Sequence, residues 1–276
     1  MLYICATPIG NLNDITLRAL EVLALADIIL CEDTRVSKKL LHQHGISYKR
    51  LLALHEHNEN EIADKVLAWL DEGLTLVQIS DAGTPGVSDP GSRLCNKVLE
   101  TGHKIVPIPG PCAYISLLSV AGLNIPSLFY GFLSSKSGAR CNILNQWCQV
   151  NYAVCLYEAP HRISECVKDI IQCLGKERLI IMGRELTKQF ETIKKCTAQE
   201  LLAFIEADSN QQRGEFVLII APAVVEKDIA SLSMEQINAL NLLLPELPPK
   251  KAVALAHKLV GGDKDLLYQH AVASKR

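Results

Sequence analysis

Short apolar runs alternate with longer amphipathic segments over the first 122 residues, and no other feature of the sequence limits the fold as strongly. Each run has the length of a buried strand, and the segments between the runs have the length and periodicity of helices. The expected strands are Leu2–Ala6, Ile28–Cys31, Leu51–Leu54, Leu76–Ile79 and Lys104–Ile108. Because consecutive strands separated by helices need crossover connections, this half of the chain predicts a largely parallel sheet.

Polar residues mark where several of these helices are expected to begin. Asp14 is expected to cap a helix that carries Ile15, Leu20 and Leu23 on one face. Asn58 with Glu61, and later Thr197 with Glu200, have the three-residue spacing of a capping box.

The pattern changes after Gly122, where short strands follow one another with fewer helices between them. This predicts a mixed sheet in a second α/β domain, and beyond Pro222 only helices are expected. The expected strands are Leu128–Phe132, Ala153–Tyr157, Leu179–Met182, Phe190–Lys194 and Phe216–Ile220, with helices at Ile163–Cys173 and Ala198–Ala207. The fold class is therefore α/β, with expected domains at residues 1–118 and 119–223 and a helical extension at 224–276.

Composition indicates a globular cytoplasmic protein. Of the 276 residues, 49% are hydrophobic and 21% are charged, which suits a sizeable core. No secretory signal and no apolar run of membrane-spanning length is visible. None of the ten cysteines forms a Cys-x-x-Cys pair, so we expect reduced, buried thiols and no metal site. The pairs His42/His44 and His55/His57 are interpreted as surface residues.

Three loops rich in glycine and proline follow expected strands. They are Thr7–Asn11, Ser80–Gly86 and Pro107–Ala113. One such loop alone is more often a tight turn, but three at corresponding strand ends favour a ligand site at that edge of the sheet. The phosphate-binding Gly-x-x-x-x-Gly-Lys-Ser/Thr and Gly-x-Gly-x-x-Gly patterns are absent, as is the Gly-x-Ser-x-Gly of serine hydrolases.

Polar clusters at other strand ends contain candidate acids, bases and phosphate-binding groups. They lie at Cys31–Arg35, Tyr157–Arg162 and Gly183–Glu191. Acid–base chemistry draws on such sets, and so do salt bridges between domains and helix caps. The residues alone leave both interpretations open.

Basic residues gather in two places. The segment Thr34–Arg50 contains five lysines and arginines and no acid, and lysines also outnumber acids near the C-terminus. Basic clusters bind phosphate backbones, although a run of charge is more often a solvated helix face.

At these clusters the chain resembles the ribosomal RNA small-subunit methyltransferase I family, within the tetrapyrrole methylase superfamily. The similar stretches are ATPIGNLNDITLRAL from Ala6, CEDTR from Cys31, SDAGTPGVSDPG from Ser80, VPIPGPCA from Val106, YEAPHR from Tyr157, GRELTKQFE from Gly183 and GEFVLII from Gly214. Seven motifs in the same order are far more specific than any one of them.

The resemblance implies a two-domain tetrapyrrole-methylase-like fold and a homodimer that uses S-adenosylmethionine. It also implies 2′-O-methylation of a cytidine ribose in the decoding region of small-subunit (16S) ribosomal RNA, with the RNA or the 30S subunit as partner. The implied cofactor contacts are Pro8, Ile9, Gly10, Asp81, Gly83, Thr84, Cys112, Ala113, Tyr157, Gly214, Glu215 and Phe216.

Two departures from the family concern side chains. Cys112 stands where relatives usually have serine, so only backbone contacts are expected there. The segment Phe132–Arg140 lacks the proline and the denser basic loop of relatives, which predicts a weaker hold on RNA.

A base must take the hydroxyl proton during methyl transfer. The unranked candidates are Asp33, Glu158 and Glu185, with Arg35, His161 and Arg162 expected to position phosphate or to hold the acids. The alternatives are a tetrapyrrole C-methyltransferase, whose usual Gly-Gly-Asp-Pro loop is replaced here, and a non-catalytic RNA-binding factor.

Overall fold

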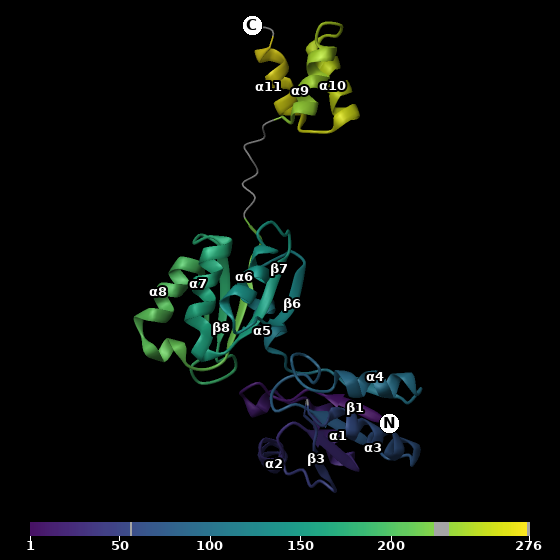
Figure 1. Ribbon diagram of the computed structural model, residues 1–276. Helices are drawn as coiled ribbons and strands as arrows, with labels where there is room; N and C mark the ends of the chain where they lie inside the picture. Colours follow the sequence, from purple (N-terminus) through teal and green to yellow (C-terminus); the bar gives the residue numbers. More distant parts are fainter. Residues whose placement is uncertain (56, 224–231, 275–276) are drawn as a thin grey trace. The chain divides into compact units, whose positions relative to one another are not determined.

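The computed structural model describes residues 1–55, 57–223 and 232–274, and it divides into two units, Met1–Ala223 and Val224–Arg276 (Figure 1). Within the described residues, no helix is both long and apolar enough to cross a membrane. The first unit contains two five-stranded sheets, and the second is helical.

The first sheet is parallel throughout, with strand order β3-β2-β4-β1-β5. Helices α1 and α2 cover one face with residues such as Leu23 and Leu41, while α3 and α4 cover the other with Val66 and Leu94. The bounds are β1 Leu2–Cys5, α1 Leu17–Leu25, β2 Ile28–Cys31, α2 Thr34–Gln43, β3 Leu51–Ala53, α3 Glu59–Asp71, β4 Leu76–Ile79, α4 Ser92–Glu100 and β5 Ile105–Ile108. The expected parallel α/β architecture is confirmed.

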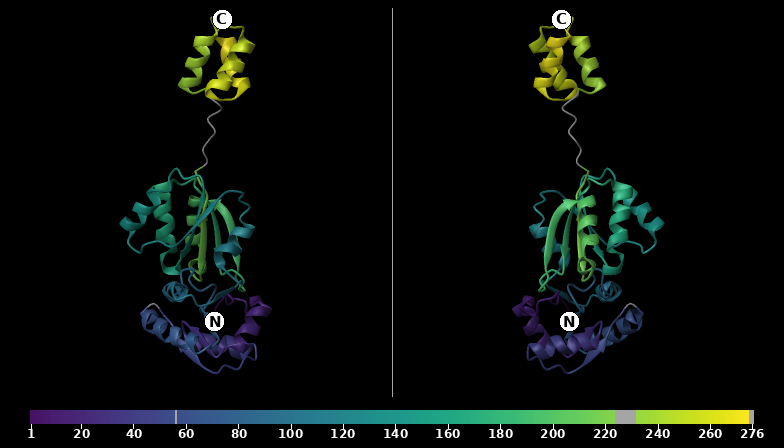
Figure 2. Two further views of the ribbon diagram at one scale, coloured as in Figure 1. Left: turned by 90° about the vertical axis from the view of Figure 1, so that its right-hand side faces the viewer. Right: turned by 90° about the vertical axis from the view of Figure 1, so that its left-hand side faces the viewer.

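The second sheet is mixed, with order β6-β7-β10-β8-β9 and a parallel β6–β7 pair among antiparallel neighbours. Helices lie on both sides of it (Figure 2). The buried residues of α6, α7 and α8 form the core on one face, and Leu117 of α5 contributes to the core on the other. The bounds are α5 Ala113–Val120, β6 Ser127–Phe132, α6 Ser137–Asn145, β7 Ala153–Glu158, α7 Ile163–Leu174, β8 Leu179–Arg184, β9 Thr192–Thr197, α8 Ala198–Ala207 and β10 Phe216–Ile220.

The second unit contains three helices among its described residues: α9 Met234–Leu243, α10 Pro249–Val260 and α11 Lys264–Ala273. They enclose a small core of Leu240, Val253, Ala256, Leu267 and Ala271. The expected domain boundary between residues 118 and 119 falls inside α5, and that boundary stays a prediction. The start of the helical extension at residue 224 lies outside the described residues.

Asp14 is not the cap of α1, and the expected capping box of Asn58 and Glu61 does not form, although Asn58 stands at the N-cap position of α3. Asp14 ends a short 3-10 turn, Leu12–Asp14, and Thr16 caps α1 by accepting from the amide of Ala19. Asn58 makes no cap hydrogen bond because its side chain is used by the preceding loop, accepting from the His55 amide and donating to the Ala53 carbonyl. The capping box of Thr197 and Glu200 is confirmed.

The loop expected around residues 134–140 is partly helical, because α6 begins at Ser137. Arg140 is 1% exposed and forms an ion pair with Asp169. Arg140 therefore belongs to the packed interior and not to a basic loop that could contact RNA.

Candidate functional site

The three glycine-proline loops meet at the carboxyl ends of β1, β4 and β5. Thr7 and Gly83 exchange backbone hydrogen bonds of 2.8 and 3.0 Å, so the loops after β1 and β4 are joined directly. The Thr84 hydroxyl donates to the Pro111 carbonyl at 3.0 Å and ties in the loop after β5. Adjacent strands β4-β1-β5 bring together loops that are far apart in the sequence.

A cavity of about 370 Å³ lies between these loops and the carboxyl end of β7, within the usual range for small-molecule sites. Its lining comes from both sheets of the first unit. The lining residues are Ile9, Glu32, Asp81, Ala82, Gly83, Thr84, Val87, Ser88, Asp89, Cys112, Ala113, Phe132, Tyr157, Glu158, Ala159, Pro160, Glu215, Phe216 and Val217. We refer to this space as the donor cavity.

Most residues expected to contact the cofactor line the donor cavity; Pro8, Gly10 and Gly214 do not. Gly10 packs on the loop after β8, where an added Cβ would stand 2.4 Å from Cγ of Lys188. Gly214 has a φ of +89°, and a Cβ there would stand 2.4 Å from Cγ of Glu185. Both glycines therefore permit close packing beside the cavity.

Tyr157 gives the donor cavity one apolar wall. Its hydroxyl accepts a 3.2 Å hydrogen bond from the Tyr114 amide, and its ring meets Phe129 and Phe132 edge to face. Cys112 Sγ lies 3.9 Å from the same hydroxyl. Burial raises the pKa of Tyr157, so this hydroxyl stays neutral at physiological pH.

Three carboxyl groups line the cavity from the first sheet: Glu32 after β2, and Asp81 and Asp89 in the loop after β4. Burial raises the pKa of all three, and that of Asp89 reaches about 6, with Glu32 and Asp81 adding to the effect. Asp81 also accepts a 3.0 Å hydrogen bond from the Asp33 amide. The site thus holds carboxyl groups whose charge a bound cation would stabilise.

Asp33 and Arg35 form a local pair at the start of α2. Asp33 accepts from the Arg35 amide at 2.8 Å and from its guanidinium at 2.6 Å. These hydrogen bonds lower the pKa of Asp33 to about 2, which makes it a weak proton acceptor. Neither residue is among those that line the donor cavity.

Glu158 ends β7, and its side chain is only 1% exposed. It accepts from the Ala159 amide at 2.8 Å and pairs with Arg162 at 3.1 Å. Arg162 also donates to the Leu133 carbonyl at 2.6 Å, which fixes its guanidinium beside this acid. His161 is exposed beside the pair.

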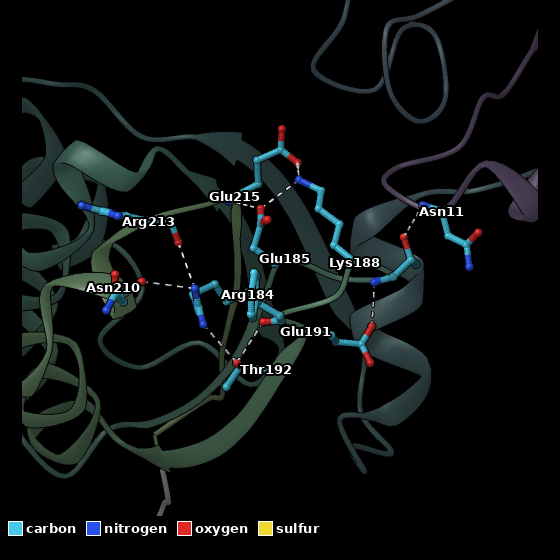
Figure 3. A network of polar contacts seen from close by, with 11 residues as sticks. Asn11, Arg184, Glu185, Lys188, Glu191, Thr192, Asn210, Arg213 and Glu215 are labelled. Atoms are coloured by element: carbon cyan, nitrogen blue, oxygen red, sulfur yellow. Dashed lines mark hydrogen bonds and ion pairs between the residues drawn. The ribbon is translucent and has the colours of Figure 1, made fainter. Parts of the chain in front are cut away.

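Glu185 belongs to a polar network at the end of β8 (Figure 3). It accepts from Lys188 at 2.8 Å and from the Glu215 amide at 2.9 Å. Although burial acts in the opposite direction, these contacts hold the pKa of Glu185 below its ordinary value. The same turn reaches the first sheet, where the Asn11 amide donates to the Thr187 hydroxyl at 3.1 Å.

Glu32, Asp89 and Phe132 line the donor cavity but were not predicted as site residues, although each stands in or beside one of the sequence motifs. The sequence did contain a signal for two of them. Glu32 directly follows the strand that ends at Cys31, and Asp89 lies within the SDAGTPGVSDPG motif. His55 and His57 were interpreted as surface residues, and both line a second cavity of about 530 Å³ that adjoins the donor cavity.

Comparisons with known proteins agree with this architecture. A family model for Tetrapyrrole (Corrin/Porphyrin) Methylases matches residues 1–202, and a model for the RsmI C-terminal HTH domain matches residues 230–275. The solved methyltransferase CobJ has a TM-score of 0.59 at 18% identity, covering 80% of this chain and 94% of that one. Uroporphyrin-III-C-methyltransferase from Thermus thermophilus has a TM-score of 0.55 at 16% identity, with coverage of 80% and 93%.

Curated relatives are much more similar. The Ribosomal RNA small subunit methyltransferase I of Neisseria meningitidis serogroup A is 46% identical, with 99% of this chain and 94% of the relative covered. The protein of the same name from Escherichia coli O157:H7 is 44% identical, with 98% and 94% covered. The chain therefore belongs to the ribosomal RNA small subunit methyltransferase I family, on the tetrapyrrole methylase fold.

Proposed function

We propose that this protein transfers a methyl group from S-adenosylmethionine to the 2′-hydroxyl of a cytidine ribose in the decoding region of small-subunit ribosomal RNA. The observation that carries the proposal is the donor cavity, bounded by the motifs on which the resemblance to the family rests. Those relatives are named for methylation of small-subunit ribosomal RNA.

The donor cavity fits a ligand with an aromatic ring and a positive charge. Phe132 and Tyr157 offer aromatic surface, while the carboxyl groups are Glu32, Asp81, Asp89, Glu158 and Glu215. No lysine, arginine or histidine occurs among the described residues that line it. An acidic cavity of this kind favours the sulfonium and amino groups of S-adenosylmethionine over an anionic nucleotide.

The proposed cofactor contacts are the expected residues that line the cavity: Ile9, Asp81, Gly83, Thr84, Cys112, Ala113, Tyr157, Glu215 and Phe216. When bound, S-adenosylmethionine supplies an activated methyl group. The chain's own task is to align the acceptor and to accept its proton, and alignment alone can contribute several powers of ten in rate. Pro8, Gly10 and Gly214 would shape the loops around the ligand.

Small-subunit particles that lack the modification, incubated with labelled S-adenosylmethionine, test this function. We expect one labelled position, mapped to a cytidine and resistant to alkaline cleavage at its 3′ side. Label on a base, or on an added porphyrinoid instead of RNA, would contradict the proposal. Absence of transfer together with retained RNA binding would favour a non-catalytic factor.

We further propose a homodimer that works in the cytoplasm. Apolar side chains are exposed along β6 and on α5: Leu128, Tyr130 and Phe132, with Ile115 and Val120. Large exposed apolar side chains that gather on neighbouring segments are typical of interaction surfaces. Light scattering should give twice the 30.3 kDa chain mass, and a Leu128→Glu variant should shift toward the monomer. A monomeric parent protein would contradict this.

A further inference from the structure

The second cavity lies at the carboxyl ends of β3, β2 and β4, along the same sheet edge as the donor cavity. Its lining comprises Glu32, His55, His57, Glu59, Ser88, Asp89, Pro90, Gly91, Ser92 and Arg93. Glu32, Ser88 and Asp89 line both cavities. Because the two cavities share three residues, they are adjacent, as the binding sites of a methyl donor and a methyl acceptor must be.

The two cavities differ in charge. The second contains His55, His57 and the exposed Arg93, whereas no basic residue was found among the described lining of the donor cavity. Histidine and arginine are good ligands for phosphate oxygens. The Nδ1 atom of His55 is buried and has no hydrogen-bond partner among the described residues.

Glu59 has a structural role in the wall of this cavity, and its carboxylate is not free to contact a ligand. Its side chain is 4% exposed and accepts from the amides of Gly91 and Leu94 at 3.1 and 3.0 Å. These contacts fix the N-terminal turn of α4 and thereby place Ser92 and Arg93 at the cavity. The acids left between the two spaces are Glu32 and Asp89.

We propose that the second cavity receives the acceptor nucleotide, that His55, His57 and Arg93 contact its phosphates, and that Asp89 takes the proton of the reacting hydroxyl. This inference rests on the proposed function and names the part of the chain that would hold the RNA. In the transfer step, the acceptor oxygen bonds to the methyl carbon, the carbon–sulfur bond breaks with its electron pair going to sulfur, and the hydroxyl proton passes to the Asp89 carboxylate.

The surroundings of Asp89 support this role. Its pKa of about 6, raised by burial and by Glu32 and Asp81, places the carboxylate close to the operating pH, where a general base is most effective. The other charged or titratable groups along the two cavities are Glu158 and Glu215 on the donor side, and His55, His57, Glu59 and Arg93 on the acceptor side. The adjoining Ser88 has a φ of +63°, a strained conformation for a residue other than glycine.

The test uses the full chain and small-subunit particles that lack the modification. Asp89→Asn should keep particle binding, while single-turnover transfer at saturating S-adenosylmethionine falls by about 100-fold or more. The parent rate should rise with pH through about 6, and the variant should lack that rise. Asp71→Asn, a change at an exposed acid on α3, is the matched control and should behave like the parent.

A second variant tests the acceptor cavity by binding alone. His57→Ala with Arg93→Ala should weaken particle binding by about 10- to 100-fold without changing cofactor affinity, and Arg18→Ala on the exposed face of α1 is its control. Full transfer by Asp89→Asn at saturating S-adenosylmethionine, or unchanged particle binding by the double variant, would overturn the proposal. If the parent chain itself modifies no ribose, the proposed function is wrong. The particle-binding measurement on the double variant would still show whether the second cavity contacts RNA.

Discussion

Nε of Arg140 donates a 2.6 Å hydrogen bond to Oδ2 of Asp169, joining α6 to α7 inside the second sheet's core layer. The side chains are 1% and 11% exposed, and the guanidinium also donates to the Ser134 carbonyl at 3.2 Å. This basic residue of the Phe132–Arg140 segment thus connects two helices inside the protein.

Arg140→Ala should destabilise the protein because it leaves the Asp169 carboxylate buried without its partner. Removing one member of a buried pair costs about 3–5 kcal/mol, measurable as a lower free energy of unfolding in urea. Exchanging both residues for apolar ones of similar volume should cost much less. Loss of RNA affinity in Arg140→Ala with unchanged stability would contradict the structural role.

Asp81→Ala should weaken S-adenosylmethionine binding by about 1.5–3 kcal/mol if the carboxylate makes a charge-assisted contact. Asp81 lines the donor cavity and already holds the Asp33 amide, so circular dichroism must confirm that the variant remains folded. Since burial raises the pKa of Asp81, binding should also weaken as the pH falls through that raised value. Calorimetry that gives the parent affinity would make Asp81 a turn residue only.

Asp89 should influence the stability of the free protein as well as its activity. Its folded-state pKa of about 6 lies above the ordinary value of 3.8, so the folded state binds more protons than the unfolded state between these values. Stability contributed by this group must therefore fall as the pH rises from about 4 to about 6. Denaturant titrations across this range should show a smaller decrease in Asp89→Asn than in the parent. Parallel curves would show that Asp89 is not buried as described.

The parallel first sheet could be predicted because its strands read as short apolar runs, and the inner strands β2 and β4 are buried throughout. The strand after the Gly183–Glu191 motif was harder to predict from the sequence. This strand, β9, lies at the edge of the second sheet, and its half-exposed residues Thr192–Thr197 do not form a continuous apolar run. Helix α6 could not be predicted because its sequence lacks a clear apolar stripe. The helix begins with Ser137 and Gly138, and its buried face contains the basic residue Arg140.

The donor cavity could be anticipated from loops at strand ends, since parallel strands place those loops along one edge. The second cavity could not. It depends on Glu59 reaching from α3 to the amides of Gly91 and Leu94, a contact between residues more than 30 positions apart. The hydrogen bond from the Arg35 amide to Asp33 is that of an ordinary N-cap, but the second one, from the Arg35 guanidinium, depends on the side-chain conformation.

Helix α2 has a basic surface that is a second candidate for contact with the RNA backbone. Lys38 and Lys39 are exposed on it and line a shallow hollow together with His42 and Tyr48. No acid lines this hollow among the described residues, so it can accept phosphate oxygens without first displacing an internal ion pair.

If this surface holds the RNA backbone, changing Lys38 and Lys39 to alanine should weaken binding to small-subunit particles while cofactor affinity stays at the parent value. Each lost phosphate contact should flatten the slope of log affinity against log salt by about 0.7–0.9. Lys136→Ala is the comparison, because Lys136 is the exposed basic residue that remains before α6 once Arg140 is buried. A solvated helix face would leave both slope and affinity unchanged in the double variant. A larger loss for Lys136→Ala than for the pair would place the RNA on the second sheet's side of the first unit instead.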